Sequence, residues 1–330
     1  MSKTAKLLRR SLLGVVVSIG ITLLIVALFN VSIHRLLSIP MPILLSSIAI
    51  CISRLVAQGL RFHILVRYCS SINMRFRDSF IARGASEFFA LTTIPFVADE
   101  AVRTWILTER GEKALTALWI AFSELFFDVL IAAPISIMAG GAALMHREVG
   151  ISSVILAISV SQILMVLSIL LLARRVAWSL LKLVEPLSRL SPFIKRVFDR
   201  TREELPMIAD ASQLFTGRPI RAVIPTTFAL TIVIMTTPAL ILYMVHLNYS
   251  ELNLLDSLYA FHAGNTLGVL PLTVGGSGLT ETGIYLFSDR VYARGSWEAV
   301  VIWRVLTYYL TLLMTGAIFV NYVLWRSRRS

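Results

Sequence analysis

Charged side chains stand inside apolar stretches of the sequence, where the helical period would bring them together. Glu124 and Asp128 are four residues apart in the run LWIAFSELFFDVLIAAP, so one helix face would present two carboxylates. Such carboxylates can form an acid and base pair, carry protons or balance buried cations. Arg304 lies in the run AVVIWRVLTYYL with Tyr308 one turn further along the same face, and a guanidinium is a strong ligand for anions.

A glycine-rich turn offers a second kind of anion ligand. It follows Pro271 and consists of Gly275, Gly276, Ser277 and Gly278. A turn of this kind that opens a helix has free backbone N–H groups and lies at the positive end of the helix dipole, which suits a phosphate. Asn265, one turn before the proline, would add a polar contact, and so would His262, although a single histidine there is more often a packing residue. Glu281 is either a ligand or a first-turn acid favoured by the dipole.

Another group of ions begins a short helical run after Pro95. It contains Asp99, Glu100 and Arg103. Asp99 has two interpretations, as a ligand or as the N-cap of this run. In the anion-binding interpretation Arg103 holds the anion, and the two acids balance charge or carry protons.

Two arginines precede these runs on one helix face. Arg54 and Arg61 are seven residues apart in the second apolar stretch. Arg61 is the weakest candidate ligand, because an arginine near the membrane interface can snorkel to water. The alternative for the whole charged set is that Arg304 and Arg103 only neutralise Glu124 and Asp128 as packing partners.

The composition places these charges in a membrane. The 330-residue sequence is 57% hydrophobic and 15% charged, and its mean hydropathy is +0.78, which is typical of a polytopic helical membrane protein and far too apolar for a soluble domain. The formal net charge of +12 comes mostly from loops flanking apolar stretches, so we expect no nucleic-acid partner. Cys51 and Cys69 form no disulfide framework or metal-ligand spacing, and we expect no metal and no cofactor.

Apolar runs predict six spanning helices, near residues 11–31, 42–65, 116–140, 151–173, 220–246 and 298–325. Two further runs, 86–107 and 264–286, are broken by a proline, and neither half reaches the roughly 20 residues of a membrane crossing. They occupy matching positions, which points to a transport site. The fold class is therefore an all-α polytopic membrane protein with six spans and two broken re-entrant helix pairs. It forms one domain over 1–330, with an inverted repeat of 11–141 and 151–326 and a hinge at 142–150.

The distribution of lysine and arginine predicts the orientation of the chain in the membrane. If both broken elements re-enter, 25 lysines and arginines fall on the cytoplasmic side and 4 outside, so both termini are cytoplasmic and the chain lies in the cell membrane. Arg61, Arg83 and Arg103 are counted among the 25. The basic loop 174–219 is cytoplasmic in this arrangement. Its start is either an interfacial amphipathic helix or a solvated connector.

The sequence resembles the flippase-like, lysylphosphatidylglycerol-synthase transmembrane family over nearly its whole length. The resemblance rests on five motifs: Gly59-Leu60-Arg61-Phe62; Pro95 with Asp99-Glu100-Ala101-Val102-Arg103; Glu124 with Asp128; Pro271 to Gly278 with Glu281; and Arg304 before Tyr308. Val97 and Ala98 stand where many members carry glycines, so the first turn is expected to bind less closely than the second.

The resemblance implies lipid translocation, of aminoacylated phospholipids or of polyprenyl-phosphate sugars and other lipids. Our leading prediction is a flippase in which Arg61, Arg103 and Arg304 hold an anionic head group. Because the sequence ends at Ser330 without a synthase domain, we expect no lipid aminoacylation. Two alternatives remain: an enzyme acting on a lipid head group through an acid and base pair, and a non-transporting partner of a glycosyltransferase or lipid-modifying enzyme that uses the basic loop.

Overall fold

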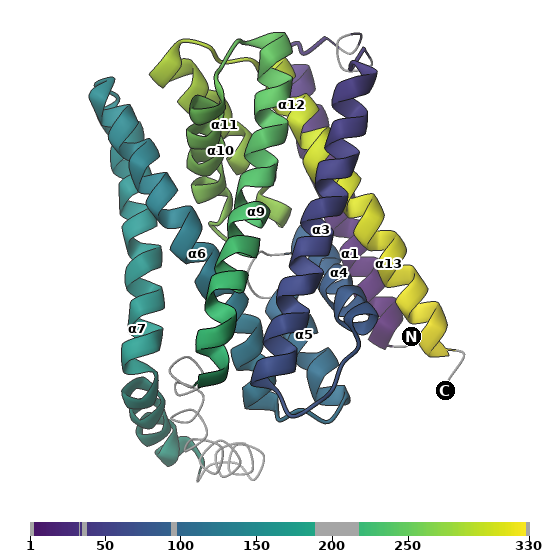
Figure 1. Cartoon of the computed structure of the whole chain (residues 1–330). Helices are drawn as coiled ribbons and strands as arrows, with labels where there is room; N and C mark the ends of the chain where they lie inside the picture. The colour runs from purple at the N-terminus through teal and green to yellow at the C-terminus, as the bar shows by residue number, and fades with distance from the viewer. Residues whose placement is uncertain (1–2, 33, 35–37, 94–97, 189–217, 328–330) are drawn as a thin grey trace.

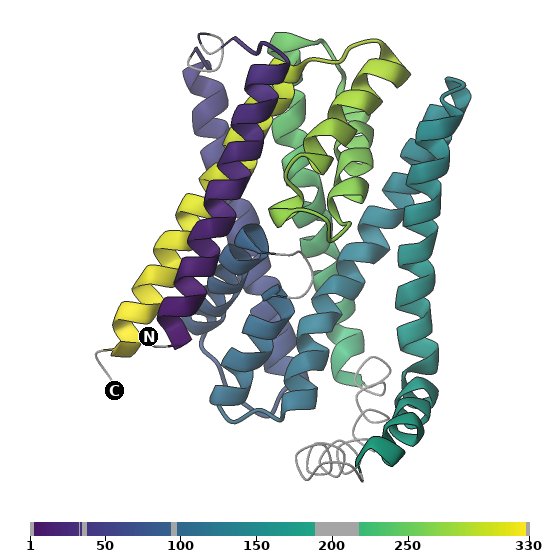
Figure 2. The same cartoon turned by 180° about the vertical axis from the view of Figure 1, so that it is seen from behind.

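The chain is a bundle of helices of very different lengths (Figures 1 and 2). The computed structural model describes residues 3–32, 34, 38–93, 98–188 and 218–327, and within them it has helices and no strand. The long elements are α1 (Lys3–Leu28), α3 (Met41–Cys69), α6 (Ala114–Met145), α7 (Val149–Ser188), α9 (Arg218–Tyr249) and α13 (Leu310–Ser327). The shorter ones are α4 (Phe76–Thr92), α5 (Ala98–Glu109), α10 (Leu254–Gly268), η1 (Val274–Gly276), α11 (Leu279–Tyr292), α12 (Trp297–Arg304) and η2 (Val305–Tyr309).

The predicted membrane fold is confirmed. Within the described residues, five helical stretches are long and apolar enough to span a bilayer: Met41–Cys69, Ala114–Met145, Val149–Ser168, Val223–Tyr249 and Trp297–Tyr322. The remaining predicted span coincides with α1, whose apolar portion is Leu13–Leu28. Large apolar side chains on the outside of these helices, such as Leu13, Leu23 and Leu313, are more than half exposed, as expected for a surface that faces lipid.

Two helical hairpins replace continuous spans at the predicted breaks. The first is α4 and α5, of 17 and 12 residues, and the second is α10 and α11, of 15 and 14 residues. At 1.5 Å per residue each helix is about 18–26 Å long, short of the roughly 30 Å hydrocarbon core. In both views α4 and α5 occupy the end of the bundle where the two termini lie, and α10 and α11 occupy the opposite end (Figures 1 and 2).

The sequence interpretation placed the starts of both hairpins too late. The first begins at Phe76 rather than near residue 86, and the second at Leu254 rather than near residue 264. The error has a physical cause in α4, where ionic side chains lower the hydropathy of a helix that is nonetheless buried. The separation into two helices falls where predicted, since α4 ends at Thr92 and α5 begins at Ala98, and α10 ends at Gly268 and α11 begins at Leu279; Pro95 lies outside the described residues.

Small residues bring the two helices of the second hairpin into close contact. A Cβ atom added to Gly283 would lie 2.7 Å from the Gly264 Cα atom, and one added to Gly264 would lie 2.6 Å from the Thr280 carbonyl oxygen. Glycines of this kind let helix backbones approach closely in a membrane protein. The hairpin is therefore a tightly packed unit.

The tips of the two hairpins meet inside the bundle. The Gly275 N–H donates a hydrogen bond to the Thr93 carbonyl oxygen at 3.1 Å. The Tyr308 hydroxyl donates to the Leu91 carbonyl oxygen at 2.5 Å, which ties η2 to the end of α4. Ser18 of α1 exchanges a 2.7 Å hydrogen bond with Ser277. Both breaks are thereby fixed at one place.

Two sequence predictions concern connections between the halves. The predicted hinge coincides with the short link between α6, which ends at Met145, and α7, which begins at Val149. The helix α7 continues to Ser188, so the first part of the predicted loop 174–219 is helical. Residues 189–217 lie outside the described part of the chain, and the amphipathic helix stays a prediction.

Candidate functional site

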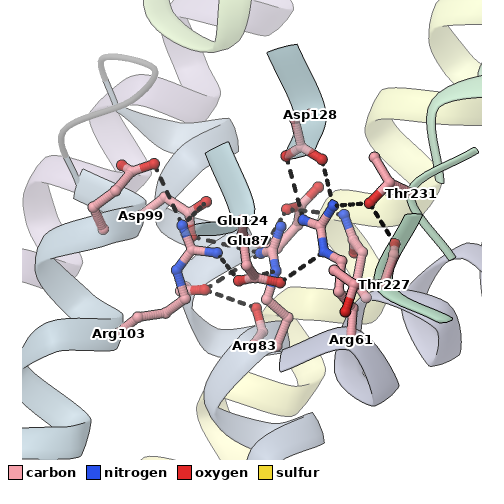
Figure 3. Close-up of polar contacts among 12 residues, drawn as sticks. Arg61, Arg83, Glu87, Asp99, Arg103, Glu124, Asp128, Thr227 and Thr231 are labelled. Atoms are coloured by element: carbon pink, nitrogen blue, oxygen red, sulfur yellow. Dashed lines mark hydrogen bonds and ion pairs between the residues drawn. The ribbon is translucent and has the colours of Figure 1, made fainter. Parts of the chain in front are cut away.

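Buried and partly buried ions from four helices converge inside the bundle, and Figure 3 shows most of them. They come from α3, α4, α5 and α6, and we call them the ionic network. Its members are Arg54, Arg61, Arg83, Glu87, Asp99, Glu100, Arg103, Glu124 and Asp128. The sequence predicted several of these ions but not that they form one network.

Glu124 is the centre of the network. Its side chain is buried, and the Arg61 Nε atom donates to Oε1 at 3.0 Å. The Arg103 Nη1 atom donates to Oε2, and the Arg83 Nε atom lies 3.6 Å from the same oxygen. A carboxylate removed from water needs such partners, because an unpaired buried charge is very costly. Through these three arginines Glu124 connects α6 to α3, α4 and α5.

Arg61 is fully buried, so it does not snorkel to water, the possibility that made it the weakest candidate ligand. Its guanidinium bonds Asp128 through two nitrogens, with Nη2 at 3.3 Å from Oδ2. Its Nη1 atom also donates to the Thr231 hydroxyl of α9 at 3.0 Å, and that hydroxyl donates to the Thr227 carbonyl oxygen at 2.8 Å. Enough buried acceptors surround Arg61 to hold its charge away from solvent.

Arg83 and Glu87 are network members that the sequence interpretation missed. Arg83 was counted as a cytoplasmic loop charge, but only 5% of it is exposed, and it lies 2.9 Å from Glu87 and 3.5 Å from Asp99. Glu87 also pairs with Arg54 of α3 at 3.5 Å. The i,i+4 spacing of Arg83 and Glu87 was the available signal. Arg103 was counted with the loop charges as well and is 2% exposed.

A second ionic centre lies at the glycine-rich turn. The Arg304 Nε atom is 2.9 Å from Glu281 Oε1, so Arg304 pairs with Glu281 and not with Glu124 or Asp128. Its Nη2 atom donates to the Gly275 carbonyl oxygen at 3.1 Å and to the Ser277 hydroxyl at 2.6 Å. The guanidinium carbon also lies 3.7 Å from the centre of the Tyr308 ring, a cation–π contact. Tyr308 lies in the π-helical turn η2, directly after α12.

The backbone N–H groups of the turn are engaged within the protein. Gly275 donates to Thr93, Ser277 donates to the Val274 carbonyl oxygen at 3.0 Å, and Gly278 donates to Glu281 Oε2 at 2.8 Å. Gly275, Gly276 and Gly278 have φ angles of 54°, 69° and 86°, a region that favours glycine. In this conformation three of the four N–H groups of the turn already have an acceptor within the protein.

One cavity of about 250 Å³ connects the network to the second centre. It lies where the ends of α4 and α10 meet the starts of α5 and α11. Its lining comes from both hairpins and from α3, α6, α9, α12, η2 and α13. Its polar members are Arg54, Asp99, Glu100, Arg103, Asp128, Asn265, Thr280, Arg304, Thr307, Tyr308 and Thr311, and Gly275 of the glycine-rich turn also lines it. The predicted site residues Asn265 and Tyr308 are therefore close to the ions. Glu124 and Glu281 do not line the cavity, but each pairs with an arginine that does: Glu124 with Arg103, and Glu281 with Arg304.

Two other sequence predictions have structural counterparts. His262 does not line the cavity and packs against the Phe261 ring with centroids 5.0 Å apart, as in its packing interpretation. Cys51 and Cys69 are free and buried. Among the described residues, no group of three or more histidine, cysteine, aspartate or glutamate side chains is placed to hold a metal ion.

The helices and the buried ions together define a polytopic membrane protein with paired helical hairpins around a charged cavity. The family described as the lysylphosphatidylglycerol synthase TM region matches residues 11–314, and the chain belongs to this family. The resemblance inferred from the motifs is thus confirmed. No curated protein matches the sequence.

Proposed function

We propose that this protein moves a lipid with an anionic head group across the cytoplasmic membrane. The head group binds in the central cavity, and Arg54, Arg103 and Arg304 provide its positive ligands. The acyl or polyprenyl chains stay in the surrounding lipid. In this proposal the hairpins re-enter the membrane from opposite faces and belong to an inverted repeat, as in other transporters with broken helices.

The cavity is the observation that carries the proposal. It lies inside the bundle, at the contact between two hairpins that come from opposite ends of it. A cavity of about 250 Å³ is smaller than most pockets for drug-sized ligands and suits a head group alone. Ionisable side chains at such a depth in a membrane protein usually mark a substrate or ion pathway.

The same geometry weighs against acid and base catalysis by Glu124 and Asp128. Both carboxylates already accept guanidinium hydrogen bonds, so the oxygens that a catalytic base would use are engaged within the protein. The partner hypothesis depends on the basic loop 174–219, whose residues 189–217 are outside the described chain. Binding and translocation therefore fit the described residues best.

The proposal is tested with purified protein reconstituted into vesicles that contain a fluorescent phosphatidylglycerol. Dithionite quenches only the label on the outer leaflet, so the quenched fraction reports translocation. We expect the wild type to accelerate translocation over protein-free vesicles. Arg54→Gln should slow it by about tenfold or more, because one charge-assisted contact contributes about 1.5–3 kcal/mol.

Arg54 is the best arginine to change and Arg294 is its matched control. Arg54 lines the cavity and has a single ion pair among the described residues, at 3.5 Å, so its loss should leave the fold intact. Arg294 is exposed and pairs with the exposed Glu251, so Arg294→Gln should translocate at the wild-type rate. A wild-type rate no higher than that of empty vesicles would overturn the proposal, as would equal rates for Arg54→Gln and wild type.

A further inference from the structure

The ionic network contains one more acid than base. Within the described residues, four arginines face five carboxylates, while Arg304 and Glu281 of the second centre balance each other. An uncompensated charge in a low-dielectric interior is costly, and such a carboxyl group normally binds a proton or another cation. One carboxyl group of the network should therefore have fewer arginine contacts than the other four.

The hydrogen bonds single out Glu100. Glu124, Glu87 and Asp99 each face two or more cations, Asp99 through Arg83 at 3.5 Å and Arg103 at 3.1 Å, and Asp128 receives two nitrogens from Arg61. Glu100 has only the Arg103 Nη2 atom, at 3.3 Å from Oε1, and shares it with Asp99, which is closer at 3.1 Å.

The second oxygen of Glu100 has no hydrogen-bond partner among the described residues. This atom, Oε2, is buried, and the residue as a whole is only 5% exposed. Glu100 also lines the central cavity, next to Asp99 and Arg103. A buried oxygen with an open acceptor position beside a cavity is a binding position for a cation, and a proton is the smallest one.

We propose that Glu100 is the proton-binding residue of the central cavity, and that an anionic head group and a proton bind there together. The inference rests on the proposed function. A head group adds negative charge beside Glu100 and so strengthens proton binding from water to this carboxylate. By linkage, the bound proton strengthens head-group binding by the same factor.

The charged neighbours of Glu100 come from every helix packed on α5. The network members on these helices are Arg83 and Glu87 of α4, and Glu124 and Asp128 of α6. Arg54 and Arg304 lie across the cavity. Each of these arginines except Arg54 has a carboxylate within 3 Å, so little positive charge is left for Glu100.

The test measures proton uptake by the full chain in detergent and weak buffer with a pH dye. The probe is glycerophosphoglycerol, a soluble phosphodiester that does not itself titrate near neutral pH. We expect wild-type protein to take up protons on binding, and its affinity to fall with rising pH, by up to about tenfold per pH unit. Glu100→Gln, an isostere of the protonated acid, should bind without uptake and without this pH dependence.

The exposed Glu251 gives the matched control, since Glu251→Gln should behave like wild type. Should Glu100→Gln not fold, the pH dependence of wild-type affinity decides alone. Binding without proton uptake and with pH-independent affinity would overturn the inference and leave the proposed function standing. Equal uptake by Glu100→Gln and wild type would do the same. Absence of binding by the wild type at every pH would instead overturn the proposed head-group site, and this inference with it.

Discussion

Loss of Arg61 should destabilise this protein more than loss of a surface ion pair. Its guanidinium bonds Glu124 and Asp128 of α6 and Thr231 of α9, and none of it is exposed. Arg61→Met leaves these acids without their shared donor, so the free energy of unfolding should fall by about 3–5 kcal/mol. Thermal unfolding in detergent micelles measures the loss as a lower Tm.

The control for this change is Arg294→Gln, which breaks a pair whose side chains are 47% and 83% exposed. It should cost less than about 1 kcal/mol, because exposed pairs contribute little. Adding Asp128→Met to Arg61→Met should cost less than the two single losses together, since the double variant removes an acid left unpaired. An Arg61→Met protein as stable as Arg294→Gln would contradict the central role of Arg61.

The sequence predicted the residue types of the site better than their partners. Glu124, Asp128 and Arg103 stand out because ions are rare in apolar helices. Arg83 and Glu87 sit in a polar-looking stretch, where their i,i+4 spacing indicates a pair but not its burial, which follows from the packing of α4 inside the bundle. The partner of Arg304 was open too, because pairing with Glu281 depends on how a loop folds back on a distant helix.

The contact between the hairpins depends on one glycine more than on its neighbours. Gly275 has φ 54°, and a Cβ there would lie 2.6 Å from the Leu91 carbonyl oxygen and 2.7 Å from Tyr308 Cε2. Gly278 has φ 86°, but its Cβ would meet only Ile21 Cγ2, at 3.3 Å. Gly275→Ala should therefore push the tips apart, with a larger loss of Tm and of lipid translocation than Gly278→Ala.

Both variants carry backbone strain, so the difference between them isolates the steric contact. Dithionite accessibility in vesicles and thermal unfolding in micelles give the two readouts. If Gly275→Ala and Gly278→Ala lose the same Tm and the same translocation rate, the tip contact does not hold the hairpins together.

The helix breaks were predictable, but the shape of the last span was not. Proline and glycine interrupt a helix by local chemistry, and both breaks occur where the sequence places them. The π-helical turn Val305–Tyr309, which contains the ring partner of Arg304, has no such signal. Its existence depends on packing against other helices, which a single sequence does not display.

The whole bundle sets the two hairpins against each other from opposite ends. The α4 and α5 hairpin lies at the end with both termini, and the other hairpin lies at the far end (Figures 1 and 2). The ionic network joins the first hairpin to α3 and α6, and Arg304 of α12 pairs with Glu281 of the second hairpin. A head group in the cavity would therefore touch both halves of the chain, and a change in their relative position would change its access to each membrane face.

This arrangement predicts which loops share a side of the membrane. In a background with Cys51 and Cys69 replaced by alanine, single cysteines replace exposed residues that flank each hairpin: Asn73 and Arg110 for the first, Leu255 and Arg294 for the second. If the hairpins re-enter and the basic side is cytoplasmic, an impermeant maleimide added to intact cells should label only the second pair. Labelling of both pairs after the membrane is permeabilised is the control. Labelling of one member of a pair without the other in intact cells would mean that its hairpin crosses the bilayer, and the cavity would then no longer lie between two re-entrant tips.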